Sequence, residues 1–298
     1  MTILAYKPTV AKHNATVLKG ISGQSVSGGL EQHEFFGDLD RHHVANLNSN
    51  MSASFSTTDL KGILDITAFS AAQLTATNKL TLYWRKQVNG ASFAASSNAF
   101  STAIQDGMIS ISSISCSHGQ PATASVEVQP TWDGTNDPIT LSKTDTEPSE
   151  VVENYAYTIA AMKFGALGAS TIPLESITIN MGLEIETIGG DGEAFPSFAV
   201  LSSRRPTISI TTRDIGKAFD FDLLADYDGT DDMILYFARL EPGASRYADG
   251  SAQHIKVTVK AHSIMTDSVS DTSASFTVKP LWDGTNDVFQ FATASTIT

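Results

Sequence analysis

The six residues Trp-Asp-Gly-Thr-Asn-Asp occur twice in the chain, at Trp132–Asp137 and again at Trp282–Asp287. An ordered series of matches with a slowly drifting spacing indicates a tandem duplication with insertions in its loops. We therefore expect two similar domains, residues 1–146 and 147–298, joined within the polar, acidic segment Ser142–Asn154. The further matches pair Ala124–Val128 with Ala274–Val278, Leu82–Trp84 with Leu235–Phe237, and Ser54–Asp59 with Ser209–Asp214.

Length and composition permit two such domains and exclude several protein classes. The chain has 298 residues, 41% of them apolar, which is unlike a disordered protein. Its formal net charge of −13 argues against a protein that binds nucleic acid through the phosphates. The single cysteine, Cys116, excludes an internal disulfide and a multi-thiolate metal site. Neither a signal peptide nor a bilayer-spanning stretch is recognisable, so we expect no membrane association.

Alternation of apolar and polar residues predicts strands over most of each half. The spacing of the apolar residues changes after Asp59 and Asp214, where it becomes that of an α-helix. Each of these aspartates can cap the helix that follows it. Thr211 and Thr212 are alternative caps for the second helix, which is expected to reach Leu224. We therefore expect a mainly β protein of two tandem β-sandwich or partly open barrel domains, each with one flanking α-helix. The strands predicted in the second half are Ile177–Met181, Leu183–Ile188, Phe195–Leu201, Pro206–Thr212, Met233–Arg239, His254–Ala261 and Ser273–Lys279.

The repeated hexapeptide could be a binding loop, but a structural role is sufficient to explain it. Asp-Gly is a strong hairpin signal, because glycine adopts a positive φ without steric cost. The preceding tryptophan can hold the turn against a sheet. We therefore interpret both copies as structural turns.

Two acidic groups deserve consideration as metal sites. Asp226–Asp232 resembles a calcium loop, but the EF-hand template places Leu224 and Leu235 at ligand positions. We interpret this segment as a solvated acidic turn, with an adventitious divalent ion as the alternative. The other group, which has no histidine counterpart in the second half, consists of Asp38, Asp40, His42 and His43. We expect neither a metal site nor a cofactor.

Sequence motifs for catalysis are also missing. The chain contains no nucleophile elbow, phosphate-binding loop or dinucleotide fingerprint. Cys116 lies in a predicted strand that alternates Ser and Ile, without a Cys-His signature. Four further acids, Glu127, Glu184, Glu186 and Glu193, are scattered without evident pairing. We therefore predict no catalytic residues and a protein that is not an enzyme.

The order of these features resembles the tail tube, or major tail, proteins of long-tailed bacteriophages and related injection machines. In the second half the resemblance runs from the strand pair Ile177–Leu201 around Gly189–Gly192, through Pro206–Asp214 and the helix, to Thr272–Lys279 and the repeated turn. The first half follows the same course from Val17 to Asp137. Most members of this family carry one such domain and form six-membered rings. The duplicated chain is similar to members in which three subunits supply six domains.

The resemblance implies a structural virion protein whose rings stack into a tail tube through which DNA passes without specific binding. Hairpins at about Gly28–His43 and Glu186–Phe198 would reach the next ring. The net charge of −13 predicts an acidic lumen that repels DNA. The expected partners are further copies of the chain and the tape-measure, tail terminator and distal tail proteins. Assembly is expected in the cytoplasm of a bacterial host, and the final location is the virion tail.

Three other interpretations remain open. The chain could be another phage structural protein, namely a tail terminator, a distal tail ring protein or a capsid decoration protein. It could also be a tandem β-sandwich adhesin or carbohydrate-binding module, which requires an exposed aromatic platform. Trp84, Trp132 and Trp282 do not suggest such a platform, because two of them lie in the repeated turn and one in a strand. A β-rich enzyme is the third interpretation.

Overall fold

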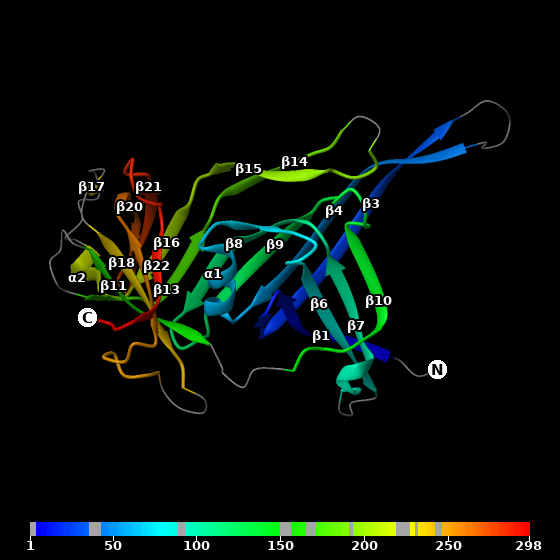
Figure 1. Ribbon diagram of the computed structural model, residues 1–298. Helices are drawn as coiled ribbons and strands as arrows, with labels where there is room; N and C mark the ends of the chain where they lie inside the picture. Colours follow the sequence, from blue (N-terminus) through cyan, green and yellow to red (C-terminus); the bar gives the residue numbers. More distant parts are fainter. Residues whose placement is uncertain are drawn as a thin grey trace.

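Antiparallel strands make up most of the computed structural model in Figure 1, which confirms the expected mainly β class. The two chain ends lie on opposite sides of the molecule in this view. The structure describes residues 4–35, 43–88, 93–149, 156–164, 171–190, 193–218, 227–229, 232–241 and 246–298.

The largest sheet has ten strands and runs through both halves of the chain. All of its pairings are antiparallel. We call it the long sheet. Its order is β17 (Tyr227–Gly229), β20 (Ala261–Val269), β21 (Ala274–Leu281), β16 (Thr207–Thr212), β13 (Ser176–Asn180), β8 (Gly107–Ser117), β9 (Thr123–Pro130), β4 (His43–Thr57) and β3 (Ile21–Phe35), with β5 (Ala71–Leu74) paired to β8.

Each half also contributes one five-stranded sheet. The first has the order β10 (Ile139–Asp145), β7 (Ala99–Ile104), β6 (Leu80–Val88), β1 (Leu4–His13) and β2 (Thr16–Leu18). The second has the order β12 (Thr171–Pro173), β11 (Tyr157–Phe164), β18 (Met233–Arg239), β19 (His254–Val259) and β22 (Gln290–Ser295). A separate hairpin pairs β14 (Leu183–Ile188) with β15 (Phe198–Arg204), and one 3₁₀ turn lies at Ser96–Asn98.

The strand pairing of the first half recurs in the second half. β1 pairs with β2 and β6, and β11 pairs with β12 and β18. In the long sheet, β9 lies between β4 and β8, and β21 lies between β16 and β20. Each half therefore has a five-stranded sheet and its own part of the long sheet, in a sandwich-like arrangement.

The core is built from the apolar positions of the alternating strands. On β9, for example, Ala124, Val126 and Val128 are buried whereas Glu127 is exposed. Buried side chains of both halves belong to one continuous cluster, since Phe55 and Ile114 of the first half are in the same cluster as Ile179 of the second. The long sheet thus has one apolar face, which is covered, and one polar face.

The first predicted helix is confirmed as α1 (Leu60–Thr67), which places Leu60, Ile63 and Leu64 in the core. Asp59 caps it, because its carboxylate accepts the Gly62 N–H at 3.0 Å. The second helix, α2 (Ile215–Ala218), begins where predicted, and its expected continuation to Leu224 lies outside the described residues.

Some predicted boundaries are wrong. The segment predicted as the strand Phe195–Leu201 becomes regular only at Phe198, where β15 begins after Pro196. The segment His254–Ala261 is not one strand, because the chain leaves β19 at Val259 and enters the long sheet at Ala261.

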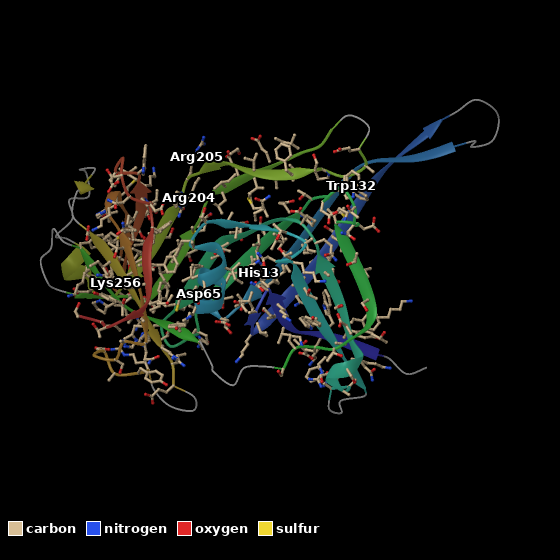
Figure 2. The ribbon with its side chains drawn as sticks, viewed as in Figure 1. His13, Asp65, Trp132, Arg204, Arg205 and Lys256 are labelled. Atoms are coloured by element: carbon tan, nitrogen blue, oxygen red, sulfur yellow. The ribbon has the colours of Figure 1, made fainter. Side chains whose placement is uncertain are left out.

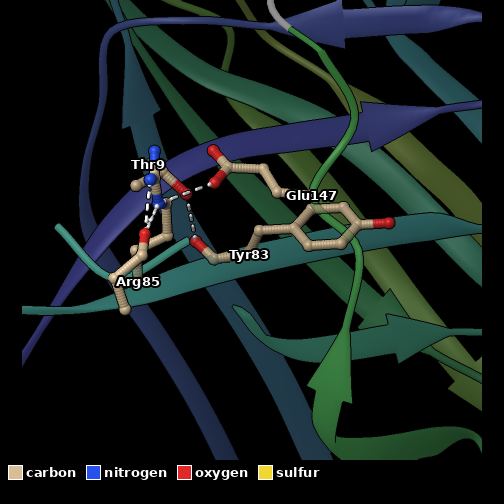
Figure 3. Close-up of polar contacts among 5 residues, drawn as sticks. Thr9, Tyr83, Arg85 and Glu147 are labelled. Carbon is tan, nitrogen blue, oxygen red and sulfur yellow. Dashed lines mark hydrogen bonds and ion pairs between the residues drawn. The ribbon is translucent and has the colours of Figure 1, made fainter. Parts of the chain in front are cut away.

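The expected linker also begins later than predicted, because Ser142–Asp145 belong to β10 and pair with β7. The residues that follow are held against the first half. The buried Glu147 carboxylate lies 3.3 Å from Nε of Arg85, and its backbone N–H donates to Ser96 O. Figure 3 shows this ion pair beside the hydrogen bond from Thr9 to Tyr83 O.

The repeated hexapeptide is a turn, as predicted, but it does not close a hairpin. The strands that flank its first copy, β9 and β10, belong to different sheets. Asp133 Oδ1 accepts the N–H groups of Thr135 and Asn136 at 2.8 and 2.7 Å, so the aspartate side chain stabilises the turn. Gly134 has a φ of 87°, which explains the glycine. Asp283 makes the same two bonds in the second copy.

Candidate functional site: a seam between the halves and two open edges

The two halves meet where β8 pairs with β13, a contact that we call the seam. Ser113 lies opposite Asn180, and Cys116 lies opposite Ile177. The register matches the alternation of both strands, so apolar side chains face the core on each side of the seam. His118 N–H donates to Glu175 O at 2.7 Å just beyond one end, and Met181 N–H donates to Ser112 O at 3.0 Å at the other. The seam therefore makes one sheet out of two halves.

The thiol of Cys116 is part of this seam and faces the core. Its Sγ accepts the N–H of Ile159 at 3.1 Å, and burial raises the pKa of the thiol. A higher pKa leaves less of the thiolate that nucleophilic chemistry or metal binding requires. The contacts of Cys116 are those of a packing residue.

An aromatic cluster joins the end of α1 to the second half. The rings of Phe69 and Phe289 are stacked with centroids 5.3 Å apart, and the Phe291 ring lies 5.5 Å from Phe69. Arg204 of β15 donates to Phe69 O at 2.7 Å, and its guanidinium lies 5.2 Å from the centre of the Phe289 ring. In Figure 2 Arg204 and its neighbour Arg205 lie at the part of the molecule where the two halves meet. The first half thus packs its helix end against strand β22 of the second.

The two tryptophans of the repeated turn have different surroundings. Trp132 is half-buried, and its backbone N–H donates to Pro196 O, in the loop of the β14–β15 hairpin, at 2.8 Å. The side chain of Trp282 is 71% exposed. The expectation that the tryptophan holds the turn against the protein is therefore wrong for Trp282.

The long sheet ends in β3 on one side and, on the other, in β20 with the short strand β17 beside part of it. The short strand β17 pairs only with His262–Ile264 of β20. Residues Met265–Val269 of β20 have no strand on that side within the described part of the chain. Strand β3 pairs with β4 alone among the described strands. Exposed strand edges of this length are templates for pairing with another chain.

Hydroxyl groups predominate on the polar face of the long sheet, where the apolar residues Met265 and Leu281 are exposed as well. Because directly paired residues of antiparallel strands lie on the same face, the register places these side chains together. The charged side chains described on this face are Glu127, Asp267 and Lys279. The hydroxyl residues are Ser22, Ser25 and Ser27 on β3, Ser52, Ser54 and Ser56 on β4, Thr123 and Ser125 on β9, Ser110, Ser113, Ser115 and Ser117 on β8, Ser176 and Thr178 on β13, Thr207, Ser209 and Thr211 on β16, Ser275 and Thr277 on β21, and Ser263 and Ser268 on β20.

Two shallow pockets lie at the ends of the seam. One, of about 550 Å³, is lined by His118, Glu175 and Arg213, with the Arg213 guanidinium 2.8 Å from the Glu175 carboxylate. The hydrogen bond from Arg213 lowers the pKa of Glu175. The other, of about 280 Å³, lies between Glu127 and Asn180. Both are open surface depressions with one or two charged groups.

The candidate metal groups predicted from the sequence lie mostly outside the described residues. This applies to Asp38, Asp40 and His42, and of His43 only the backbone is described. In the acidic turn, Asp232 accepts Lys260 Nζ at 2.8 Å, while Asp226 lies outside the described part. The described residues contain no group of three or more potential metal ligands.

The scattered glutamates are not brought together into one site. Glu184 accepts the hydroxyl of Ser203 at 2.6 Å across the β14–β15 hairpin. Glu193 accepts the N–H of Gly190 at 2.9 Å in the loop of that hairpin. Glu127 lies on the polar face of the long sheet, opposite Ser54.

Comparison with known proteins adds no family to this description. No protein-family model matches the chain, and a search of curated proteins finds no relative. Within the described part of the chain, none of the helices combines the length and apolar character needed to cross a bilayer. The seam, the open edges and the hydroxyl face are therefore the features from which a function must be argued.

Proposed function

We propose that the chain is a tandem duplication of one tube domain and that its copies join head to tail into rings, which stack as the tail tube of a bacteriophage-like particle. The observation that carries this proposal is the seam. If the halves are copies of one domain, the strands that meet at the seam have counterparts at the two open edges. β20 then corresponds to β8, and β3 corresponds to β13.

The counterparts follow from sequence and pairing together. Ser113 and Ser268 both lie opposite a serine of the repeated Ala-Ser-Val-Glu-Val or Ala-Ser-Phe-Thr-Val strand. Asn180 lies opposite Thr207, and Ser27 lies opposite Ser52. Ser52 and Thr207 are separated in the sequence by the same number of residues as the repeated positions Ser54 and Ser209. The pair Ser113–Asn180 of the seam thus has the counterpart Ser268–Ser27. These two residues lie at opposite ends of the same sheet, so only two copies can pair them.

An interface between two different edges is heterologous and closes into a ring when the rotation per subunit allows it. Closure removes both edges, which otherwise favour uncontrolled association. Three copies would supply six domains, in keeping with the resemblance to tail tube proteins. The hairpins that extend from β3–β4 and from β14–β15 would contact the next ring.

The long sheet would form the wall of the lumen. Its apolar face is covered by the five-stranded sheets and α1, so the hydroxyl face is the one left to border the passage. With Glu127 and Asp267 against Lys279, the described part of this face is only weakly acidic. We therefore propose a hydroxyl-lined passage in place of the strongly acidic lumen predicted from net charge. With Lys279 as its one cation among the described residues, this face offers DNA phosphates few of the contacts that a DNA-binding protein makes.

In this proposal the remaining partners are tape-measure, tail terminator and distal tail proteins, and the assembled protein is part of a virion. Electron microscopy of the purified full-length chain over a range of concentrations tests the proposal. Stacked rings or tubes with a central channel are the expected result. A chain that remains monomeric at every concentration would falsify it, and single rings that never stack would favour a tail terminator or distal tail role.

Cysteine cross-linking tests the edge pairing itself. The variant Ser27→Cys/Ser268→Cys is expected to form disulfides between copies, since directly opposite residues of paired strands are within reach of a disulfide. The variant Ser113→Cys/Asn180→Cys is the matched control, because its disulfide crosses the seam inside one chain. Single-cysteine variants establish the background. Oxidised Ser27→Cys/Ser268→Cys that runs as a monomer contradicts the proposed edge pairing.

A further inference from the structure

The first half has an open apolar groove at the edge of its sandwich. The groove has a volume of about 360 Å³ and is lined by Tyr6, Val26, Trp84, Phe100 and Leu141. Tyr6 and Phe100 meet edge to face with ring centroids 4.7 Å apart. Leu141 on strand β10 is 78% exposed although it is a large aliphatic residue. A pocket of this kind on a single copy requires an explanation.

The second half shows what fills the counterpart of this groove. The repeated hexapeptide aligns Leu141 with Phe291, and both residues lie on the outermost strand of their five-stranded sheet. Phe291 is not left exposed, because Phe69, from the end of α1 in the first half, packs against it and against Phe289. The apolar surface that is open beside Leu141 is therefore closed beside Phe291 by the helix end of the preceding domain.

We infer that this groove, which we call the Tyr6–Leu141 groove, is the acceptor site for a second copy of this chain. The part of the second copy that enters the groove is the end of its second half that bears α2. This inference rests on the proposed function, since it assigns the side-chain contacts of the proposed ring interface. In a head-to-tail arrangement the domain preceding the first half is the second half of a neighbouring copy. Its helix α2 follows Asp214, just as α1 follows Asp59.

The groove is continuous with the open edge of the long sheet. Val26, one of its lining residues, belongs to β3, so a strand added to β3 would bring its own domain directly over the groove. A second copy is therefore favoured over an unrelated peptide as the occupant. The same contact that joins the backbones would cover the apolar side chains.

Trp282 marks the other side of the same interface. The backbone N–H of its counterpart Trp132 donates to Pro196 O in the loop of the β14–β15 hairpin, so the first copy of the turn is held against the other half of the chain. No further half follows Trp282 in one copy, and its side chain is 71% exposed. In the ring, Trp282 would meet the β3–β4 hairpin of the following copy. Large aromatic residues buried at the centre of an interface commonly dominate its binding energy.

Two substitutions test the inference on the full-length chain. Leu141→Asp and Trp282→Ser alter side chains that are exposed in a single copy, so both variants are expected to fold with an unchanged melting temperature. Each is expected to raise the protein concentration for half-assembly at least about tenfold, measured by mass photometry and sedimentation velocity. Phe93→Asp is the matched control, because Phe93 is 40% exposed and lies outside the groove, and an aspartate can pair with the Arg85 guanidinium that now lies over the Phe93 ring.

The possible results separate this inference from the proposed function. Wild-type rings together with a monomeric Leu141→Asp variant and an assembling Phe93→Asp variant support both. If Leu141→Asp and Trp282→Ser assemble like the wild type, the groove assignment is overturned while the ring proposal stands. If the wild type never assembles, both are overturned. Equal loss of assembly in all three variants overturns the groove assignment, because the effect is then one of added polarity alone.

Discussion

Cys116 of β8 and Ile177 of β13 lie directly opposite each other across the seam, and both side chains are buried. One residue comes from each half of the chain. Because they share one core, the two halves are expected to unfold together in one transition and not as independent domains.

Ile177→Ala removes buried methyl groups at the seam and should lower the free energy of unfolding by about 2–5 kcal/mol. Urea denaturation followed by tryptophan fluorescence and by circular dichroism measures the change. The two probes are expected to report one coincident transition, because the substitution weakens a core common to both halves. Thr178→Ala, an exposed neighbour on the same strand, is the control and should change little. Two separate transitions in the wild type would contradict the shared core.

Arg204 is expected to be a stabilising residue of the junction, in contrast to Arg205 beside it. Arg204 donates to Phe69 O and lies over the Phe289 ring, whereas Arg205 is exposed. Arg204→Ala should cost about 1–3 kcal/mol of unfolding free energy through the lost charge-assisted hydrogen bond and ring contact. Arg205→Ala should remain within about 0.5 kcal/mol of the wild type. Equal effects of the two substitutions in urea denaturation would argue against this role.

The sequence predicted strands, helix starts and turns well, because these depend on residues close together in the chain. Alternation located most strands, and Asp59 was correctly predicted as the start of a helix. The repeated Asp-Gly was correctly predicted as a turn but wrongly as a hairpin. A glycine signals backbone conformation, whereas the partners of the flanking strands depend on packing with distant parts of the chain.

The candidate interface could not be predicted in the same way. The hexapeptides that begin at Trp132 and Trp282 are identical, yet one tryptophan is half-buried and the other is exposed. Trp132 is bonded through its backbone N–H to Pro196, a residue distant in the sequence, and no local pattern describes such a contact. Alignment of the repeats does pair Leu141 with Phe291, but only the structure shows that one of the two positions is open.

The two threonines that precede the helices provide a matched pair for a third prediction. Thr57 donates to Lys19 O at 2.6 Å and accepts the N–H of Asp59, and Thr212 donates to Pro173 O at 2.6 Å and accepts the N–H of Asp214. Both side chains are fully buried. Replacement of either residue by Val leaves a backbone carbonyl and an N–H without their partner.

Thr57→Val and Thr212→Val should therefore each lower the unfolding free energy by about 1–3 kcal/mol, measured by urea denaturation. Thr57→Ser and Thr212→Ser keep the hydroxyl and should be milder. If only one of the two Val variants is destabilised, the two hydroxyl networks do not contribute equally. If neither is, these bonds contribute nothing net to stability.

The buried helix cap Asp59 should make stability depend on pH. Burial is the largest influence on its carboxyl and raises the pKa, while the hydrogen bond from Gly62 N–H and the nearby Lys19 act in the opposite direction. The native state therefore binds the proton more tightly than the unfolded state does. Between the ordinary pKa of an aspartate and the raised value, the unfolded state carries fewer protons, so this residue makes stability fall as pH rises.

Asp59→Asn should remove this dependence while keeping an oxygen that can accept the Gly62 N–H. Asp59→Ala loses the cap as well and should cost about 0.5–2 kcal/mol relative to Asp59→Asn. Urea denaturation of the three proteins from pH 4 to pH 7 measures both effects, with the exposed Asp65→Asn as the control for a change of net charge. The slope of stability against pH should be less negative in Asp59→Asn than in the wild type. Identical slopes would show that the charge of Asp59 is not held at the expense of folding, and an Asn variant as unstable as the Ala variant would show that the side-chain oxygen does not stabilise the helix as a cap.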